Sequence, residues 1–130
     1  DAQLLYPERA IESRIAIASD LRVKMDRRLM SYAMRNLLRN ASKYANARIV
    51  VGIALEHGNI AIFVEDDGPG VPENDRERIF DAFVRLDRRT GGYGLGLAIT
   101  RQVLHAHNGR IAVVDPVVLG GARFEISWPI

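Results

Sequence analysis

The sequence predicts an α/β fold, because helical and strand-like hydrophobic patterns alternate along the chain. Apolar residues recur at helical spacing in two segments, and short β-rich runs bounded by turn residues surround them. With 130 residues, the chain has the size of one domain and is long enough to bury a core without disulfides or a structural metal. We therefore expect one domain built from helices and a sheet.

The N-terminal part predicts a linker, a short strand and a long helix. Residues 1–9 are interpreted as a linker, so the domain is expected to span residues 10–130, and Arg14–Ala18 alternates like a strand. Asp26 can cap a helix that ends near Tyr44. The apolar stripe of this helix comprises Leu29, Ala33, Leu37 and Ala41, with Met30, Met34 and Leu38 beside them. This stripe is expected to face the core.

Two β-rich runs and a charged segment follow the helix. Arg48–Leu55 and Asn59–Glu65 are expected to pair as a hairpin, because Gly58 and the asparagine after it suit a turn. Glu73–Arg78 predicts a short surface helix. The apolar residues expected to anchor it to the core are Ile79, Phe80 and Phe83.

The C-terminal part predicts a polar loop, a second helix and two closing strands. Leu86–Tyr93 is interpreted as the loop. Leu95–His107 has helical periodicity, and the Asn-Gly pair that follows it is a stop signal for a helix. The closing strands, on either side of a Gly120-Gly121 turn, are Ile111–Val114 and Ala122–Trp128.

Composition excludes several classes of protein. The formal net charge of +2 is too small to predict binding to nucleic acid or to an anionic membrane surface, so neither partner is expected. The absence of cysteine excludes disulfides and thiolate chemistry, and it fits a reducing cytosol. The longest apolar runs are too short to span a bilayer.

The long helix carries a polar face at helical spacing. Asn36 and Asn40 are four residues apart, and Lys43 and Tyr44 follow on the same side. An asparagine oxygen is a suitable neutral ligand for magnesium, an ammonium group can pair with a phosphate, and a tyrosine ring can pack on a flat base. Taken alone, such a face is more often a solvated one, so two interpretations remain open.

A first glycine cluster follows the second β-rich run. Asp66 stands at the end of this run, where its carboxylate could accept a hydrogen bond from an exocyclic amine such as adenine N6, whereas guanine presents an oxygen there. The alternative for the Asp66–Gly70 segment is an ordinary turn, because Asp, Gly and Pro are common turn residues. The pattern is compatible with a turn that also binds adenine.

A second glycine cluster opens the second helix. Gly92, Gly94 and Gly96 lie where free backbone N–H groups and the helix dipole favour phosphate. The cluster is not a dinucleotide fingerprint, because a polar loop rather than a strand precedes it. The Gly-Lys-Ser/Thr of the common phosphate-binding loop is absent from the sequence.

Taken in order, five segments resemble the sequence boxes of the catalytic and ATP-binding domain of two-component sensor histidine kinases. They are the N box Asn36–Tyr44, the first glycine box Asp66–Gly70, the phenylalanine box Ile79–Arg85, the second glycine box Gly92–Ala98 and the closing glycine turn Gly120–Phe124. These bacterial signalling domains share the GHKL superfamily with gyrase, MutL and the large heat-shock chaperones. The resemblance implies their Bergerat fold, a two-layer α/β sandwich with a mixed, mostly antiparallel sheet and helices on one face.

The resemblance also implies roles for individual residues. Asn40 would ligate magnesium, Tyr44 would lie over the base, and Asp66 would bind adenine N6. The residues expected to act on the phosphate side in catalysis are Asn36, Lys43 and Arg85. The remaining expected ATP contacts are Gly68, Gly70, Val71, Phe80, Gly92, Tyr93, Gly94, Leu95, Gly96 and Leu97.

By the same resemblance, the domain would transfer the γ-phosphate of ATP, with Mg2+, to a histidine on a separate dimerisation domain, and a response regulator would be the next partner. It would form the cytoplasmic portion of a membrane sensor kinase, and the full-length kinase would be a homodimer. Only an N-terminal part of the full-length kinase, ahead of this domain, would contact the membrane. The alternatives are a nucleotide-sensing module without catalysis and a serine kinase of the anti-sigma-factor type.

Three departures from the family pattern accompany the resemblance. The Leu86–Gly91 loop is shorter than the ATP lid of many members, and Tyr93 replaces the usual threonine. No segment resembles the helical hairpin that carries the substrate histidine. The chain is therefore expected to be a fragment that presents ATP but does not contain its acceptor.

Overall fold

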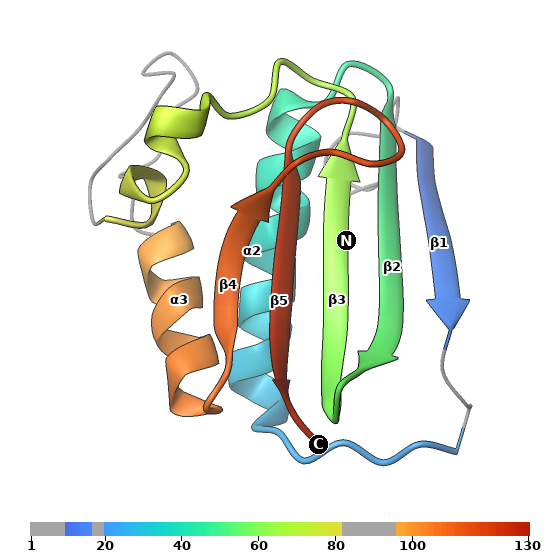
Figure 1. Cartoon of the computed structure of the whole chain (residues 1–130), viewed down its shortest axis with the longest axis vertical. Coiled ribbons are helices and arrows are strands. Elements are labelled where there is room, and N and C mark those ends of the chain that lie inside the picture. The colour runs from blue at the N-terminus through green and yellow to red at the C-terminus, as the bar shows by residue number, and fades with distance from the viewer. Residues whose placement is uncertain (1–9, 17–19, 82–95) are drawn as a thin grey trace.

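The protein contains a five-stranded sheet and two α-helices, seen in a computed structural model that describes residues 10–16, 20–81 and 96–130 (Figure 1). The elements are β1 (Ala10–Ala16), α2 (Arg27–Tyr44), β2 (Arg48–Glu56), β3 (Asn59–Asp66), the 3-10 turns η1 (Glu73–Asp75) and η2 (Arg78–Phe80), α3 (Gly96–Ala106), β4 (Arg110–Val114) and β5 (Arg123–Pro129). Within these ranges, no helix is long and apolar enough to cross a membrane.

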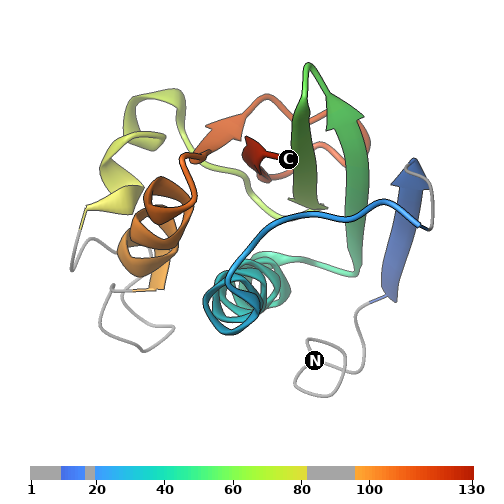
Figure 2. The same cartoon turned by 90° about the horizontal axis from the view of Figure 1, so that it is seen from below.

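The sheet and the helices form two layers. The strand order is β1-β2-β3-β5-β4; β1 runs parallel to β2, and the other neighbouring pairs are antiparallel. Figure 2 shows both α-helices on the same face of the sheet. The core lies between the layers, where the largest fully buried apolar side chains are Leu37, Ile49, Val64, Leu104 and Ile126. This confirms the predicted α/β sandwich with a mixed, mostly antiparallel sheet.

Helix α2 forms where its cap and apolar stripe predict it. The Asp26 side chain accepts a hydrogen bond from the N–H of Leu29 at 3.0 Å, and the helix ends at Tyr44 as expected. The buried stripe is Met30, Ala33, Leu37 and Ala41, whereas Leu29 is 39% exposed. A four-residue spacing drifts around a helix of 3.6 residues per turn, so the stripe cannot retain Leu29 over three turns.

The β2–β3 hairpin turns at His57-Gly58. Both residues have positive φ, 51° and 78°, which matches the two-residue turn whose twist suits a hairpin. Asn59, expected in the turn, instead pairs with Glu56 as the first residue of β3. The predicted hairpin is confirmed, with a tighter turn than expected.

The charged segment after β3 forms η1 and η2 rather than one surface helix. A helix over Glu73–Arg78 would have only six residues and would be marginal, and short connectors commonly adopt 3-10 turns instead. The anchors Ile79 and Phe80 are buried, and the Phe80 ring packs edge-on against Phe124 with centroids 6.2 Å apart. Phe83 lies outside the described residues. The segment is therefore held to the core by its end.

Helix α3 ends at the predicted stop signal. Asn108 has φ 58°, and the N–H of Gly109 donates to the carbonyl of Leu104 at 2.7 Å. Next to this end, His107 Nε2 accepts the N–H of Asp26 at 2.9 Å, while its Nδ1 contacts the carbonyl of Val103 at 2.8 Å. The His107 ring therefore joins the end of α3 to the start of α2.

Candidate functional site

Three successive carboxylates at the end of β3 accept backbone N–H groups, Glu65 and Asp66 from the β4–β5 loop and Asp67 from the α2–β2 connection. Side chains alternate across a strand, so Asp66 lies on the face covered by the helices and Glu65 on the open face. Asp67 follows the strand and reaches the connection between α2 and β2. These three residues organise the candidate site.

Asp66 is buried and only half satisfied. It is 1% exposed, and its Oδ1 accepts the N–H groups of Gly68 at 2.9 Å and Ala122 at 3.1 Å. No described residue donates to Oδ2. Burial raises the pKa of this carboxyl, the two backbone N–H groups oppose that rise, and the charges of its acidic neighbours add to it. An amine donor on a ligand would favour the ionised form.

Close backbone approach surrounds Asp66. A Cβ on Gly68 would lie 2.2 Å from the carbonyl oxygen of Tyr44, and a Cβ on Gly121 would lie 2.3 Å from the carbonyl oxygen of Asp66. Gly70 has φ 79°, a conformation that L side chains rarely adopt. Main chain therefore forms much of the wall around the carboxylate, and only glycine fits at these positions.

The polar face of α2 points toward α3. A Cβ on Gly96, the first residue of α3, would lie 3.4 Å from Asn36 Oδ1, so the Asn36 amide sits against the start of that helix. Asn36 Nδ2 is buried and has no hydrogen-bond partner among the described residues. Asn40, Lys43 and Tyr44 are half-buried. Among the described residues, Asn36 Nδ2 is thus a buried donor without a partner rather than part of a solvated surface.

Asp67 holds the connection that leads from α2 to β2. Its carboxylate accepts the backbone N–H groups of Asn46 at 2.8 Å, Ala47 at 3.1 Å and Arg48 at 3.1 Å. Burial alone would raise the pKa of Asp67, but these N–H groups outweigh it and the pKa is lowered. The C-terminal end of α2 is therefore fixed relative to the end of β3.

We expect Asp67→Asn to destabilise the protein near neutral pH but much less in acid. A lowered carboxyl pKa gives stability that is present in full above the ordinary value of 3.8 and is lost as the pH falls through the value in the folded state. Urea unfolding of both proteins between about pH 7 and about pH 3 measures the difference. A difference that stays constant over this range would contradict the assignment.

The sequence did not predict a role for Glu65, although this side chain accepts more hydrogen bonds than Asp66 or Asp67. It is 0% exposed, and it accepts the N–H groups of Val117 at 2.9 Å, Val118 at 2.7 Å and Gly120 at 3.3 Å, together with that of Leu119. Burial raises its pKa, but the hydrogen bonds outweigh burial and the pKa is lowered. The signal in the sequence that could have indicated a role for Glu65 is an acidic residue at the end of an apolar run.

The other predicted site residues fall into two groups. Val71 and Leu97 are half-buried and pack against the core, and Phe80 is buried within it, where its ring contacts Phe124. The predicted ATP contacts that lie outside the described residues are Arg85, Gly92, Tyr93, Gly94 and Leu95, together with the Leu86–Gly91 loop. Their roles stay predictions.

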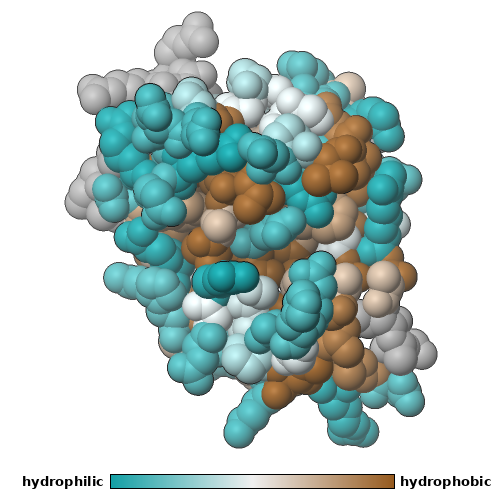
Figure 3. Space-filling view, in the orientation of Figure 1, coloured by the Kyte–Doolittle hydropathy of each residue, from teal (hydrophilic) through white to brown (hydrophobic). Residues whose placement is uncertain are grey.

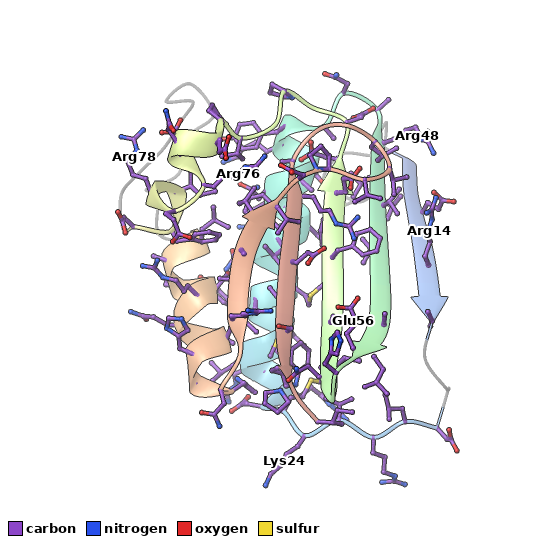
Figure 4. All side chains as sticks on the ribbon, in the orientation of Figure 1. Arg14, Lys24, Arg48, Glu56, Arg76 and Arg78 are labelled. Carbon is purple, nitrogen blue, oxygen red and sulfur yellow. The ribbon has the colours of Figure 1, made fainter. Side chains whose placement is uncertain are left out.

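Arg76, between η1 and η2, forms an ion pair with the β4–β5 loop. Its Nη1 lies 2.8 Å from Asp115 Oδ1, and Figure 4 shows Arg76 pointing from this segment toward the top of β4, whereas Arg78 points outward. Arg14 and Arg48 lie at the opposite, β1 edge of the sheet, where both contact Glu12 at 3.6 Å and 3.9 Å.

Comparison with known proteins finds one matching family model and several similar sensor proteins. The family model described as "Histidine kinase-, DNA gyrase B-, and HSP90-like ATPase" matches residues 25–130. The sensor protein RstB of Escherichia coli (strain K12) is 39% identical over 134 residues, covering all of this chain and 30% of the relative. The sensor histidine kinase CpxA of the same strain is 44% identical over 102 residues, covering 75% of this chain and 22% of the relative.

A solved structure agrees with these relatives. The nucleotide-free catalytic domain of the histidine kinase ThkA superimposes with a TM-score of 0.81 at 27% identity, covering 98% of this chain and 87% of that domain. The chain therefore spans less than a third of the length of RstB and CpxA, but 87% of one solved catalytic domain.

Proposed function

This chain belongs to the family of histidine kinase-, DNA gyrase B- and HSP90-like ATPases, and from this premise we propose that it is the ATP-binding catalytic domain of a sensor histidine kinase. The observation that carries the proposal is Asp66, a buried carboxylate with one oxygen bound by main chain and the other without a donor among the described residues. In this proposal the domain comprises residues 10–130, and residues 1–9 are a linker.

Asp66 would select adenine. Its Oδ2 can only accept a hydrogen bond when the carboxylate is ionised, so it would pair with the exocyclic amine of adenine and repel the carbonyl oxygen that guanine presents there. Because Gly68 and Ala122 hold Oδ1, the carboxylate is already oriented before a ligand arrives. The Tyr44 ring would pack against the base.

The phosphates and Mg2+ would lie between α2 and the start of α3. Asn36 Nδ2 is a buried donor without a described partner, which fits a phosphate oxygen, and the N-terminus of α3 at Gly96 favours the same charge. Lys43, together with Arg85, would neutralise phosphate charge. Asn40 would give Mg2+ an amide oxygen, and phosphate and water oxygens would complete its shell. The described residues hold no cluster of three acidic or histidine side chains that could bind a metal without phosphate.

Bound MgATP would supply the phosphoryl group, and the residues of this chain would position it. Phosphoryl transfer depends mainly on positioning and charge neutralisation, so a domain that fixes adenine at one end and phosphates at the other suffices. The nucleophile would be a histidine on a separate dimerisation domain, and a response regulator would then accept the phosphoryl group. The chain would form the cytoplasmic part of a membrane sensor kinase.

We expect Asn40→Ala to weaken magnesium-dependent binding of ATP and ADP by at least the roughly 10- to 100-fold that loss of an outer-shell partner of a metal ligand typically costs, because Asn40 would be a direct ligand. Calorimetric titration with and without Mg2+ measures the effect, and the variant should show little benefit from the metal. Asn59→Ala, which removes an amide from the β2–β3 hairpin, is the matched control and should behave as wild type. Equal affinities for Asn40→Ala and wild type in Mg2+ would remove Asn40 from the metal site.

A further inference from the structure

We propose that Glu65, on the open face of the sheet, positions the Asp66 carboxylate on the opposite face and thereby sets the preference of the site for adenine. This inference rests on the proposed ATP-binding function. Glu65 itself would not touch the nucleotide. It would act through the β4–β5 loop, which contacts both carboxylates.

Glu65 fixes the first half of this loop. Four consecutive backbone N–H groups, from Val117 to Gly120, converge on its two oxygens, and Arg123 Nη1 lies 3.1 Å from Oε1. Figure 1 shows the loop crossing in front of the end of β3, on the face away from the helices. On this face, apolar patches alternate with hydrophilic side chains (Figure 3), yet Glu65 is 0% exposed beneath the loop. A buried carboxylate thus determines where the loop lies.

The second half of the same loop holds Asp66. The N–H of Gly121 donates to the carbonyl of Asp66 at 3.0 Å, and the N–H of Ala122 donates to Asp66 Oδ1 at 3.1 Å. The N–H of Asp66 in turn donates to the carbonyl of Ala122 at 2.9 Å. The loop therefore bonds both the backbone and the side chain of Asp66 at the end of β3. The position of the loop decides where the Ala122 N–H meets the carboxylate.

The packing leaves little room for the loop to shift without moving Asp66. A Cβ on Gly121 would lie 2.5 Å from Asp66 Oδ1 and 2.7 Å from the backbone nitrogen of Gly68, so main chain and carboxylate already pack closely here. If the loop moved away, Asp66 would keep only its bond from Gly68. Its oxygens could then exchange roles, and Oδ2 would no longer be reserved for the ligand.

The negative charge of Glu65 is needed to hold the backbone N–H groups of the loop. An ionised carboxylate accepts at both oxygens, whereas a glutamine accepts at one and places an NH2 group against backbone donors. Arg123 would retain Glu125, 2.9 Å from its Nε, and the Phe63 ring, 3.7 Å from its Cζ, so the guanidinium keeps partners in a Glu65 variant. The main consequence of Glu65→Gln is therefore release of the loop.

The test compares ATP with inosine triphosphate, which differs at the base by a carbonyl oxygen in place of the amine. Calorimetric titration of wild type should give tighter binding of ATP, and Glu65→Gln should reduce the ratio of the two affinities by roughly five- to tenfold, a part of the value of one charged hydrogen bond. All titrations are made well below the Tm of each variant. Glu125→Gln alters the same face and the same arginine without touching the loop, so its ratio should equal that of wild type.

The outcomes separate three accounts. A Glu65→Gln protein with a lowered Tm but an unchanged affinity ratio would show a purely structural role and overturn the inference. Glu65→Asp keeps the charge but has a side chain one methylene shorter, so it should also reduce the ratio of ATP affinity to inosine triphosphate affinity. If either Glu65 variant is folded and its ratio is unchanged, the inference is wrong. Wild type that binds neither ATP nor ADP would instead overturn the proposed function.

Discussion

Replacing Asp66 with asparagine is expected to remove most of the affinity for ATP and ADP. The two backbone N–H groups on Oδ1 would take the amide oxygen, so the NH2 group would replace Oδ2 and face the amine of adenine. Loss of a hydrogen bond to a charged group costs about 1.5–3 kcal/mol, or roughly 10- to 150-fold in affinity, and the opposed donors add to this loss. The same change should improve binding of GTP, because the new donor matches the carbonyl of guanine.

Competition titrations of ATP against GTP with wild type and Asp66→Asn measure this reversal. Asp67→Asn is the matched control, because it makes the same chemical change one residue away, on a carboxylate that binds the α2–β2 connection. That control should lose stability and keep its preference for ATP. If wild type binds ATP and GTP equally, Asp66 has only its role in the turn.

Gly121→Ala is expected to damage both the fold and the site. The added methyl group would lie 2.3 Å from the carbonyl oxygen and 2.5 Å from Oδ1 of Asp66, so β3 and the β4–β5 loop would have to separate. Overpacking of this kind costs about 1–3 kcal/mol of stability, and the separation would also misplace the carboxylate. We therefore expect a lower urea midpoint together with a large loss of ATP affinity.

Gly120→Ala provides the comparison within the same loop. Gly120 has φ 83° but a Cβ there would meet nothing within 4 Å, so this variant carries only the backbone cost of about 1–2 kcal/mol. It should retain much more nucleotide binding than Gly121→Ala at a comparable stability. Equal nucleotide affinity in the two variants would show that the close contact at Gly121 does not control Asp66.

The parts of the fold that sequence could predict are those governed by neighbours along the chain. The cap at Asp26, the periodicity of α2 and the stop at Asn108 each depend on groups within about one helical turn. The strands of the β2–β3 hairpin were predictable for the same reason. Asp66 could be singled out because a carboxylate closes an apolar run immediately before two glycines.

The remaining features depend on contacts between distant residues. The backbone partners of Glu65 lie 52 to 55 residues further along the chain, so nothing local indicated that this carboxylate would hold a loop. Strand β1 was expected at Arg14–Ala18 but spans Ala10–Ala16, because parallel pairing with β2 sets its position. Residues 17–19 lie outside the described part of the chain.

The central claim is that this chain presents the γ-phosphate of ATP to a histidine on another domain. Asn36 is an amide and cannot act as a base toward water, so hydrolysis should be slow. A neutral imidazole is itself nucleophilic: its ring nitrogen would form the new bond to phosphorus as the bond to the ADP oxygen breaks. Transfer therefore needs only an acceptor histidine.

Incubation with radiolabelled ATP tests this claim most directly. Three samples are compared: the chain alone, the chain with the histidine-bearing hairpin of the full-length protein, and the chain with a hairpin whose histidine is changed to alanine. The account predicts negligible labelling and slow hydrolysis by the chain alone, labelling of the intact hairpin, and none of the altered one. Rapid hydrolysis by the chain alone would place it with the gyrase-like ATPases, and no labelling of the intact hairpin would contradict the kinase function.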